Sequence, residues 1–396
     1  MAKIGIYGGS FNPPHAGHIS AAKQALHALK LDRLLLIPVS AAPHKTMPHL
    51  TASGQDRLAM LELSAQGLPG LEPCDVELRR EGVSYTVDTL RILKAQFPED
   101  TFTLLMGTDM FLSFESWRAA EEICQLAELG ALYRGEKGEK EQMEAQKQRL
   151  EERFSAKITL VKNQAVEISS TDVRRLLIFR CPGDYLRPGV ESYIREKGLY
   201  ETSKDLQSLP MEELEQIVVS LLHPQRVAHV LGCRDTAVAL ARHYGANETD
   251  AARAGILHDI TKVLPPAQQL LLCQTYGVEL DEFSMENAKT LHALTGSLVA
   301  ERIFGENEAV CSAICHHTTG CANMTLLEKI IYIADYMEPN RDFPEVEALR
   351  EVTWRDLDSA VLMGLEMTLA ILQANRRAIA PDSLAAIADL KQKLGG

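Results

Sequence analysis

The stretch KIGIYGGSFNPPHAGHIS at residues 3–20 decides the fold of the first half of the chain. It begins with a short apolar run typical of a buried strand, ends that run in two glycines, and passes into helical apolar spacing over residues 18–30. The same alternation recurs downstream, with strands predicted at 33–40, 101–107, 129–134 and 157–162 and helices at 54–66 and 117–128. Strands that alternate with helices indicate βαβ units, so the sequence predicts an α/β domain with a mostly parallel sheet. A charge-rich segment at 135–153 is expected to be a helical insert with a solvated face.

The second half of the chain has a different pattern. Strand signals stop near residue 200, and residues 211–394 show helical spacing broken by proline or glycine at Pro224, Pro265–Pro266, Gly305, Gly320 and Pro339. The stretch ETSKDLQSLP (201–210) is polar and ends in proline where the periodicity changes. We therefore expect an α/β domain at 1–201, a linker at 202–210 and an all-α domain at 211–396.

The distribution of charged residues and histidines argues against a nucleic-acid-binding function for the second half of the chain. The chain has 396 residues and a net charge of −13, and residues 1–201 hold 25 of the 41 basic and 27 of the 54 acidic side chains. The second half is therefore strongly acidic, and it also holds seven of the twelve histidines. Clustered Lys and Arg mark a nucleic-acid surface, so this half is better suited to a metal cation than to a nucleic-acid polymer.

The sequence also predicts where the protein acts. No apolar run approaches the roughly 20 residues that span a bilayer, and MAKIGIYGGS lacks the features of a signal peptide. We therefore expect a cytoplasmic protein without a membrane partner, in which the eight scattered cysteines are reduced thiols.

A first candidate site lies in GGSFNPPHAGHIS (8–20), between the first strand and the first helix. Glycines allow the backbone to approach a ligand, and His15 and His18 lie three residues apart at the beginning of a helix. Open backbone N–H groups at a helix N-terminus favour a phosphate chain. The segment ISSTDVRRLL (168–177) offers hydroxyl groups and an arginine at the beginning of another helix. The sequence contains neither a Walker P-loop nor a G-x-G-x-x-G motif after the first strand.

A second candidate site follows from histidines and aspartates in apolar helical segments of the second half. In chain order they are His229, His258–Asp259, His292, His316–His317 and Asp335. Unpaired charges in such segments are costly, and imidazole with carboxylate is a donor set for transition metals. The sequence therefore predicts a metal centre in a helical bundle.

Residues 1–200 resemble the bacterial nicotinate-nucleotide adenylyltransferases of the HxGH nucleotidyltransferase superfamily. The resemblance runs through GGSFNPPHAGH, PHK (43–45), SYTVDTL (84–90), MGTDMFLSFESW (106–117), ISSTDVRRLL and GVESYIREKGLY (189–200). It implies a Rossmann-like fold and transfer of AMP from ATP, with Mg²⁺, to nicotinate mononucleotide, giving deamido-NAD and pyrophosphate.

The resemblance also implies roles for single residues. His15 and His18 would contact the phosphates as catalytic residues, and Ser170, Thr171 and Arg174 would hold the β- and γ-phosphates. The other residues implied at the nucleotide and mononucleotide sites are Gly8, Gly9, Ser10, Phe11, Lys45, Thr86, Asp109 and Trp117. Asp109 is expected near the riboses, and Trp117 is expected to stack on the nicotinate ring whose carboxylate Thr86 receives. Arg134 departs from the family pattern, because Gly135 follows it directly in place of a proline.

Residues 211–390 resemble the HD-domain phosphohydrolases, in particular those that cleave diadenosine tetraphosphate symmetrically into two ADP. HPQRVAHVLG (223–232), LHDITK (257–262), CHHTTG (315–320) and ADYMEPNR (334–341) carry this resemblance. It implies that the first metal, expected to be iron, is bound by His229, His258, Asp259 and Asp335. A second metal or the phosphates would be contacted by His292, His316 and His317, and a polyphosphate would be clamped by Arg226, Lys262 and Arg341. Asp259 is also expected to be catalytic.

Three alternatives stay open at this point. The second domain could act on a deoxynucleotide, a cyclic dinucleotide or an alarmone, or it could be a regulatory ligand-binding module. The first domain could transfer a nucleotidyl group to another acceptor, such as nicotinamide mononucleotide or phosphopantetheine. The number of metals, the oligomeric state and any coupling between the two sites are not fixed by the sequence.

Overall fold

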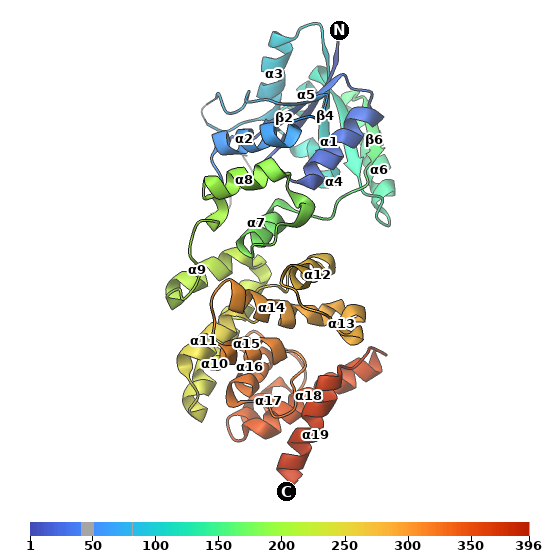
Figure 1. Cartoon of the computed structure of the whole chain (residues 1–396). Coiled ribbons are helices and arrows are strands. Elements are labelled where there is room, and N and C mark those ends of the chain that lie inside the picture. The colour runs from blue at the N-terminus through green and yellow to red at the C-terminus, as the bar shows by residue number, and fades with distance from the viewer. Residues whose placement is uncertain (41–50, 81, 396) are drawn as a thin grey trace. The chain divides into compact units, whose positions relative to one another are not determined.

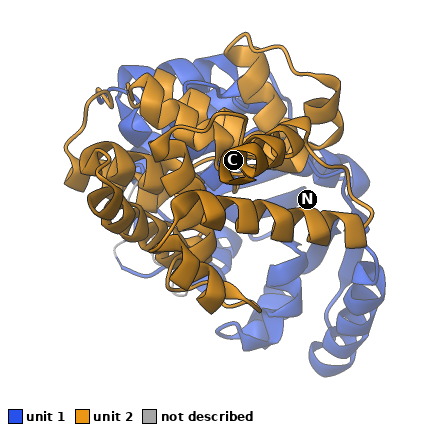
Figure 2. Ribbon diagram, turned by 90° about the horizontal axis from the view of Figure 1, so that it is seen from below, with its two compact units in different colours: residues 1–204 blue, residues 205–396 orange. Residues whose placement is uncertain are grey.

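A computed structural model describes residues 1–40, 51–80 and 82–395 of the chain. The chain divides into two compact units, Met1–Lys204 and Asp205–Gly396, which are distinguished in Figure 2. Each unit is treated separately below. The helices and strands are labelled in Figure 1.

The first unit is an α/β domain built on a parallel sheet. Its strands are β1 (Lys3–Gly9), β2 (Arg33–Pro38), β3 (Leu71–Pro73), β4 (Thr101–Gly107), β5 (Glu128–Tyr133) and β6 (Ile158–Lys162). Its α-helices are α1 (Ala16–Ala28), α2 (Gly54–Ala65), α3 (Thr86–Gln96), α4 (Thr108–Leu112), α5 (Ala120–Leu126), α6 (Glu139–Phe154), α7 (Ser170–Ile178) and α8 (Pro188–Glu196). The 3₁₀ turns are η1 (Phe114–Ser116), η2 (Gly183–Tyr185) and η3 (Leu199–Glu201). The predicted alternation is therefore confirmed, apart from the short β3.

Side-chain alternation explains why this sheet is buried on both faces. In β2, Leu34 and Leu36 pack with Ala21, Ala22 and Ala25 of α1, whereas Leu35 and Ile37 belong to the cluster on the opposite face. Because successive side chains of a strand point to opposite faces, a continuous apolar run fills both layers.

The strand order is β3-β2-β1-β4-β5-β6, and every neighbouring pair is parallel. This is the doubly wound Rossmann arrangement, whose ligands bind beyond the carboxyl ends of the strands where the order reverses. In this unit the reversal lies between β1 and β4, so the loop after Gly9 and the helix after Gly107 flank the expected ligand position.

The second unit is helical throughout its described residues. Its helices are α9 (Met211–Leu221), α10 (Pro224–Tyr244), α11 (Glu248–Leu257), α12 (Pro266–Thr275), α13 (Glu282–Glu286), α14 (Leu291–Arg302), α15 (Glu308–His316), α16 (Leu326–Met337), α17 (Val346–Thr353), α18 (Leu357–Ala374) and α19 (Pro381–Gly395), with the 3₁₀ turn η4 (Ala288–Thr290). Helix α10 packs against α11 and α16, and α15 packs against α11, α14 and α16. These helices bring the candidate metal ligands together.

Helix α18 was not anticipated as a special segment. Among the described helices it alone is long and apolar enough to cross a membrane, by length and composition. It packs against α16, α17 and α19, and 28% of it is buried in the structure.

Candidate active sites

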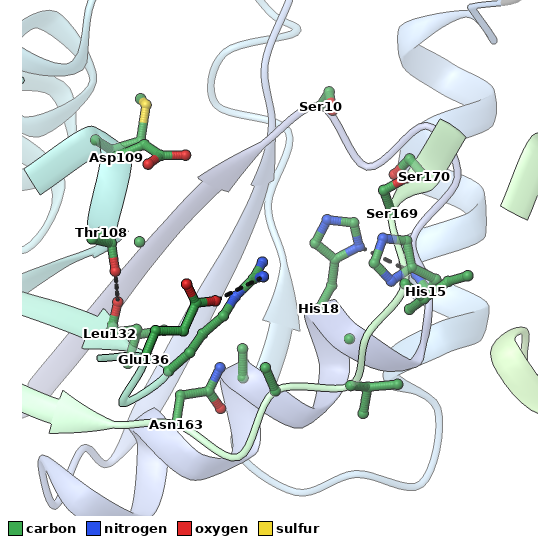
Figure 3. Close-up of a pocket in the computed structure, with 18 of the residues that line it drawn as sticks. Ser10, His15, His18, Thr108, Asp109, Leu132, Glu136, Asn163, Ser169 and Ser170 are labelled. Carbon is green, nitrogen blue, oxygen red and sulfur yellow. Dashed lines mark hydrogen bonds and ion pairs between the residues drawn. The ribbon is translucent and has the colours of Figure 1, made fainter. Parts of the chain in front are cut away.

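The first candidate site is a cleft of about 870 Å³ at the carboxyl ends of the central strands of the first unit (Figure 3). Its lining includes Ser10, His15, His18, Asp109, Arg134, Ser170, Thr171 and Arg174 of the residues discussed in the sequence analysis. These residues come from the loop after β1, the helix after β4, the end of β5 and the beginning of α7. The cleft therefore lies where the strand order predicts a ligand.

The two histidines adjoin each other at the beginning of α1. Their ring centroids are 3.8 Å apart, and the His15 backbone N–H donates to Nδ1 of His18 at 3.3 Å. Burial lowers the pKa of His15 to about 4, and burial together with the neighbouring His15 lowers the pKa of His18 well below its usual value. Both rings are therefore neutral near pH 7. Since Nδ1 of His18 is an acceptor, its proton is on Nε2, which leaves an N–H donor.

The beginning of α7 is tied directly to the loop that precedes the histidines. The Ser170 hydroxyl donates to the Pro13 carbonyl at 3.0 Å, and Nη1 of Arg174 donates to the Asn12 carbonyl at 2.6 Å. Nη2 of Arg174 also donates to the Thr171 hydroxyl at 3.1 Å. Ser169 caps α7, because its hydroxyl oxygen accepts the Asp172 N–H at 3.1 Å. The N-terminus of α7 and the loop between β1 and α1 are therefore joined by hydrogen bonds and form one side of the cleft.

The charge-rich insert differs from its prediction. Its helix forms as α6, but its first residues are not merely a solvated face, because Glu136, Lys137 and Glu139 line the cleft. The Glu139 carboxylate accepts the N–H groups of Gly135 and Glu136 at 2.6 and 3.1 Å and the Thr108 hydroxyl at 2.5 Å. These hydrogen bonds lower the pKa of Glu139, although burial alone would raise it. Glu139 therefore joins the ends of β4 and β5 beside Asp109.

Several residues implied by the resemblance lie away from the described lining of the cleft. The Phe11 side chain is fully buried and packs edge-on against His18, with ring centroids 4.9 Å apart. Phe11 thus supports a histidine instead of facing the ligand. Thr86 begins α3, and Trp117 packs against Phe114 with ring centroids 5.4 Å apart; neither is among the lining residues. Gly8 and Gly9 end β1, and a Cβ at Gly8 would meet only open space. Lys45 lies outside the described residues.

Three supporting residues were missed by the sequence analysis. Asn12 receives the Tyr200 hydroxyl on Oδ1 at 2.9 Å, and Arg57 donates to the Ser10 carbonyl at 2.8 Å. All three side chains are at most 5% exposed. They fix the loop that precedes His15 and His18. Arg57 lies 47 residues after its partner Ser10, and Tyr200 lies 188 residues after its partner Asn12. No local pattern marks such contacts.

The second candidate site is centred on Asp259, immediately after α11. Its Oδ2 lies 3.6 Å from Nε2 of His229 and 3.4 Å from Nε2 of His258. Its Oδ1 lies 3.5 Å from Nε2 of His292 and 3.7 Å from Nε2 of His317. One carboxylate therefore presents a different oxygen atom to each of two histidine pairs.

Asp335 of α16 joins the first of these pairs. Its Oδ1 is 3.1 Å from Nε2 of His229 and 3.9 Å from Nε2 of His258. Ligand atoms of His229, His258 and Asp335 lie within 4.8 Å of one another, as do those of His258, Asp259 and His317. The structure thus brings together six of the seven residues predicted as metal ligands.

The histidines are oriented so that Nε2 is available to a cation. Nδ1 of His258, His292 and His317 lies 2.6–2.8 Å from the carbonyl oxygen three residues earlier in each case. A carbonyl only accepts, so each Nδ1 carries a proton, and Nε2 is the nitrogen whose lone pair the neutral ring offers to a cation. A carbonyl that accepts the Nδ1–H in this way fixes the tautomer of a metal-binding histidine. Buried Nε2 of His229, Nε2 of His258 and Oδ1 of Asp259 have no hydrogen-bond partner among the described residues, so this donor set fits a metal ion.

The electrostatics of the cluster keep its two carboxylates charged. Burial would raise the pKa values of Asp259 and Asp335, but neighbouring histidines hold both well below their usual range. Burial likewise would lower the pKa of His258, which Cys233 and Asp259 raise well above its usual value. The two aspartates therefore stay ionised in a buried position.

The three basic side chains predicted to bind a polyphosphate contact the histidines and aspartates of the cluster. Arg226 pairs with Asp259, and Arg341 pairs with Asp335. Nζ of Lys262 lies 2.8 Å from Nε2 of His292 and 3.8 Å from Oδ1 of Asp259. Their cationic groups thus lie beside the proposed metal ligands.

His316 does not join the cluster. Its Nδ1 lies 2.9 Å from Oε1 of Glu328, and it groups with Glu328 and Cys321 instead. Adjacent residues at the end of a helix point in directions about 100° apart, so His316 and His317 cannot both face Asp259. The structure therefore separates His316 from His292 and His317, with which it was expected either to hold a second metal or to contact the phosphates.

Comparisons with known proteins agree with this division. Residues 6–176 match the Cytidylyltransferase-like family, and residues 226–340 match the HD domain family. A probable nicotinate-nucleotide adenylyltransferase of Halalkalibacterium halodurans is 37% identical over 210 residues, which are 52% of this chain and 96% of that protein. A Mycoplasma pneumoniae protein, named a probable nicotinate-nucleotide adenylyltransferase/Ap4A hydrolase, is 28% identical over 91% of this chain and 97% of its own.

A solved structure also matches the second half. It is a predicted HD superfamily hydrolase involved in NAD metabolism from Clostridium acetobutylicum, 36% identical, with a TM-score of 0.46, and the match covers 47% of this chain and 98% of that one. The first half thus matches nearly the whole length of a curated relative, and the second half carries a distinct domain. The chain belongs to the nicotinate-nucleotide adenylyltransferase family and joins that domain to an HD domain.

Proposed function

We propose that the first unit transfers AMP from ATP to nicotinate mononucleotide. The observation that carries this proposal is the cleft at the β1–β4 reversal, with His15, His18 and Arg174 in its lining. A phosphate oxygen of the mononucleotide attacks the α-phosphorus of ATP, a new P–O bond forms, and the bond to the β-phosphate breaks to release pyrophosphate. The protein supplies no nucleophile, so its contribution is positioning and stabilisation of charge.

The individual roles follow from the contacts. Nε2–H of His18 donates to the phosphate chain as negative charge moves toward pyrophosphate, with His15 beside it. Ser170, Thr171 and Arg174 bind the β- and γ-phosphates at the N-terminus of α7, where the helix dipole favours an anion. ATP would be bound together with Mg²⁺, which would offset part of the charge of the phosphates.

Of the residues that would bind the mononucleotide, Asp109 lies in the lining of the cleft, whereas Thr86 and Trp117 lie outside it. Asp109, at the beginning of α4, binds a ribose, while Trp117 and Thr86 receive the nicotinate ring and its carboxylate. Lys45, which lies outside the described residues, stays a predicted substrate-binding residue. Comparison of kcat/KM for nicotinate and nicotinamide mononucleotide tests this choice of acceptor; equal values would favour a different acceptor and contradict it.

We propose that the second unit is a metal-dependent phosphohydrolase that cleaves diadenosine tetraphosphate into two ADP. The observation that carries this proposal is the convergence of four Nε2 atoms on the two oxygens of Asp259. His229, His258, Asp259 and Asp335 would hold one ion, and His292, His317 and the other oxygen of Asp259 would hold a second. Iron or a similar transition metal suits this mixture of imidazole and carboxylate. When bound, such ions supply Lewis acidity that activates water and neutralises charge on phosphate oxygens.

The chain's own residues complete the reaction. Arg226, Lys262 and Arg341 exchange their carboxylate and imidazole partners for phosphate oxygens, and so orient the tetraphosphate. Symmetrical cleavage then requires water to attack one of the two central phosphorus atoms, with ADP as the leaving group. Action on another nucleotide, or a purely regulatory role, is the alternative for this unit.

Metal analysis tests the centre directly. The full chain is expected to contain transition metal after purification, to lose hydrolysis on chelation and to regain it when metal is restored. Asp259→Ala should lose both metal and hydrolysis. A metal-replete Asp259→Ala variant with full hydrolysis would contradict the proposal. The small-molecule partners proposed for the chain are the substrates of these two reactions.

A further inference from the structure

A buried carboxylate outside the predicted ligand set contacts one of the proposed metal ligands. Glu338 follows α16 directly and is 1% exposed. Its Oε1 lies 3.1 Å from Nδ1 of His229. The other three histidines that face Asp259 use a main-chain carbonyl at the corresponding position. His229 alone has an anion there.

The Glu338 carboxylate is fixed in place at its other oxygen. Oε2 accepts the Asn340 backbone N–H at 2.7 Å and the Asn340 side-chain amide at 2.8 Å. The Asn340 amide in turn donates to the Ala228 carbonyl at 3.1 Å, beside His229. The turn EPN at 338–340 therefore holds one carboxylate oxygen and aims the other at the imidazole.

Gly232 leaves the space that this carboxylate occupies. It lies three residues after His229 on α10, and a Cβ there would lie 2.4 Å from Oε2 of Glu338. Because Oε2 is held by two hydrogen bonds, the carboxylate cannot move aside without losing them. The sequence H-x-x-G on α10 thus provides both the ligand and the room for its partner.

The charge of Glu338 is directed onto His229. Among the ion pairs of the described residues, this carboxylate pairs with His229 and with no Lys or Arg. Buried carboxylates are costly unless paired, so Glu338 contributes most to stability when Nδ1 of His229 carries a proton. A protonated Nδ1 leaves the Nε2 lone pair pointing toward Asp259 and Asp335, and the nearby anion makes that lone pair more basic.

We infer that Glu338 is a positioning residue for the metal centre, which fixes the tautomer and orientation of His229 and strengthens metal binding without touching substrate. This inference rests on the proposed metal centre of the second unit. It assigns a role to Glu338 and Gly232 that the predicted ligand set does not include.

Cobalt binding to the full chain tests the inference. After chelation, wild type and variants are titrated with Co²⁺, with calorimetry for affinity and visible absorption for ligand geometry. Glu338→Gln should weaken Co²⁺ binding by about 10- to 100-fold, the range for loss of a second-shell partner, and should alter the visible spectrum. Gly232→Ala should shift affinity in the same direction, because it displaces a carboxylate that is still present.

Glu306→Gln is the matched control. Glu306 is also a buried carboxylate of the second unit, with a side chain 2% exposed, but it pairs with Arg253 at 2.6 Å and contacts no proposed ligand in the described structure. Glu306→Gln should lower the unfolding temperature while Co²⁺ affinity and spectrum stay unchanged. Adenylyl transfer, measured on each sample, confirms equal amounts of active protein.

Three results would overturn the inference. Wild-type affinity and spectrum in Glu338→Gln would show that the carboxylate does not influence His229. Equal weakening in Glu306→Gln would assign the effect to general destabilisation. Absence of Co²⁺ binding by the wild type would instead remove the metal centre itself, and with it the inference.

Discussion

Substitution of Arg174 by lysine keeps the positive charge in the phosphate cleft but removes the planar guanidinium with its several N–H donors. Arg174 is 7% exposed, and its guanidinium reaches both the Asn12 carbonyl, at 2.6 Å, and the Thr171 hydroxyl, at 3.1 Å. Lysine keeps the charge but presents one compact ammonium group, so it cannot hold the loop, the hydroxyl and a phosphate together.

The expected magnitude follows from the lost contact. A hydrogen bond from a charged donor contributes about 1.5–3 kcal/mol. Each 1.36 kcal/mol corresponds to a factor of ten in rate, so Arg174→Lys should lower kcat/KM for ATP by roughly 10- to 150-fold. Initial rates of adenylyl transfer at varied ATP, with saturating nicotinate mononucleotide, measure this change.

Arg175→Lys provides the matched control for this prediction. Arg175 is 6% exposed and pairs with Asp172 at 2.8 Å, but it does not line the cleft. Its substitution should lower thermal stability and leave kcat/KM within about threefold, the size of ordinary remote effects. If Arg174→Lys stays within that range, or if both variants lose activity equally, the role assigned to Arg174 is refuted.

The other predictions concern His258, His15 and Glu139. His258→Ala should remove metal and hydrolysis but spare adenylyl transfer, and loss of both activities would contradict independent sites. Because burial lowers the pKa of His15 to about 4, the unfolded chain binds a proton between about pH 6.5 and 4 that the folded chain excludes. The free energy of unfolding of the first unit should therefore decrease as the pH is lowered from about 6.5 to about 4, and should not change above pH 6.5. In His15→Gln, urea unfolding should show a weaker dependence of this free energy on pH. An unchanged pH dependence would contradict the lowered pKa of His15. Glu139→Gln places an amide donor against the N–H groups of Gly135 and Glu136, so KM for ATP should rise roughly tenfold while KM for the mononucleotide is unchanged.

Much of the architecture was predictable because burial imposes simple periodicities. Apolar runs such as TFTLLMG and KITLVK mark strands covered on both faces, and the observed strands β4 and β6 agree with them to within one residue. Strand β3 was missed because Leu71–Pro73 is only three residues long and ends in proline. Its position depends on pairing with β2, which local sequence does not encode.

The sequence predicted which residues gather at the two sites better than it predicted the directions in which their side chains point. The order of histidines and aspartates anticipated the cluster, but the dipeptide His316–His317 offers two candidates of which helix geometry selects one. Nor could the sequence reveal that Phe11 supports His18 from the core. Glu139 and Glu338 were missed for a shared reason, since each acts through tertiary hydrogen bonds to a distant segment.

Product analysis of diadenosine tetraphosphate tests the central claim of a second, metal-dependent catalytic centre most directly. The metal-replete full chain is incubated with the substrate, and the nucleotides are separated by chromatography, with His258→Ala run in parallel. The account predicts two ADP per substrate for the wild type and no turnover for the variant. Formation of ATP and AMP, no turnover by the wild type, or equal turnover by His258→Ala would contradict it.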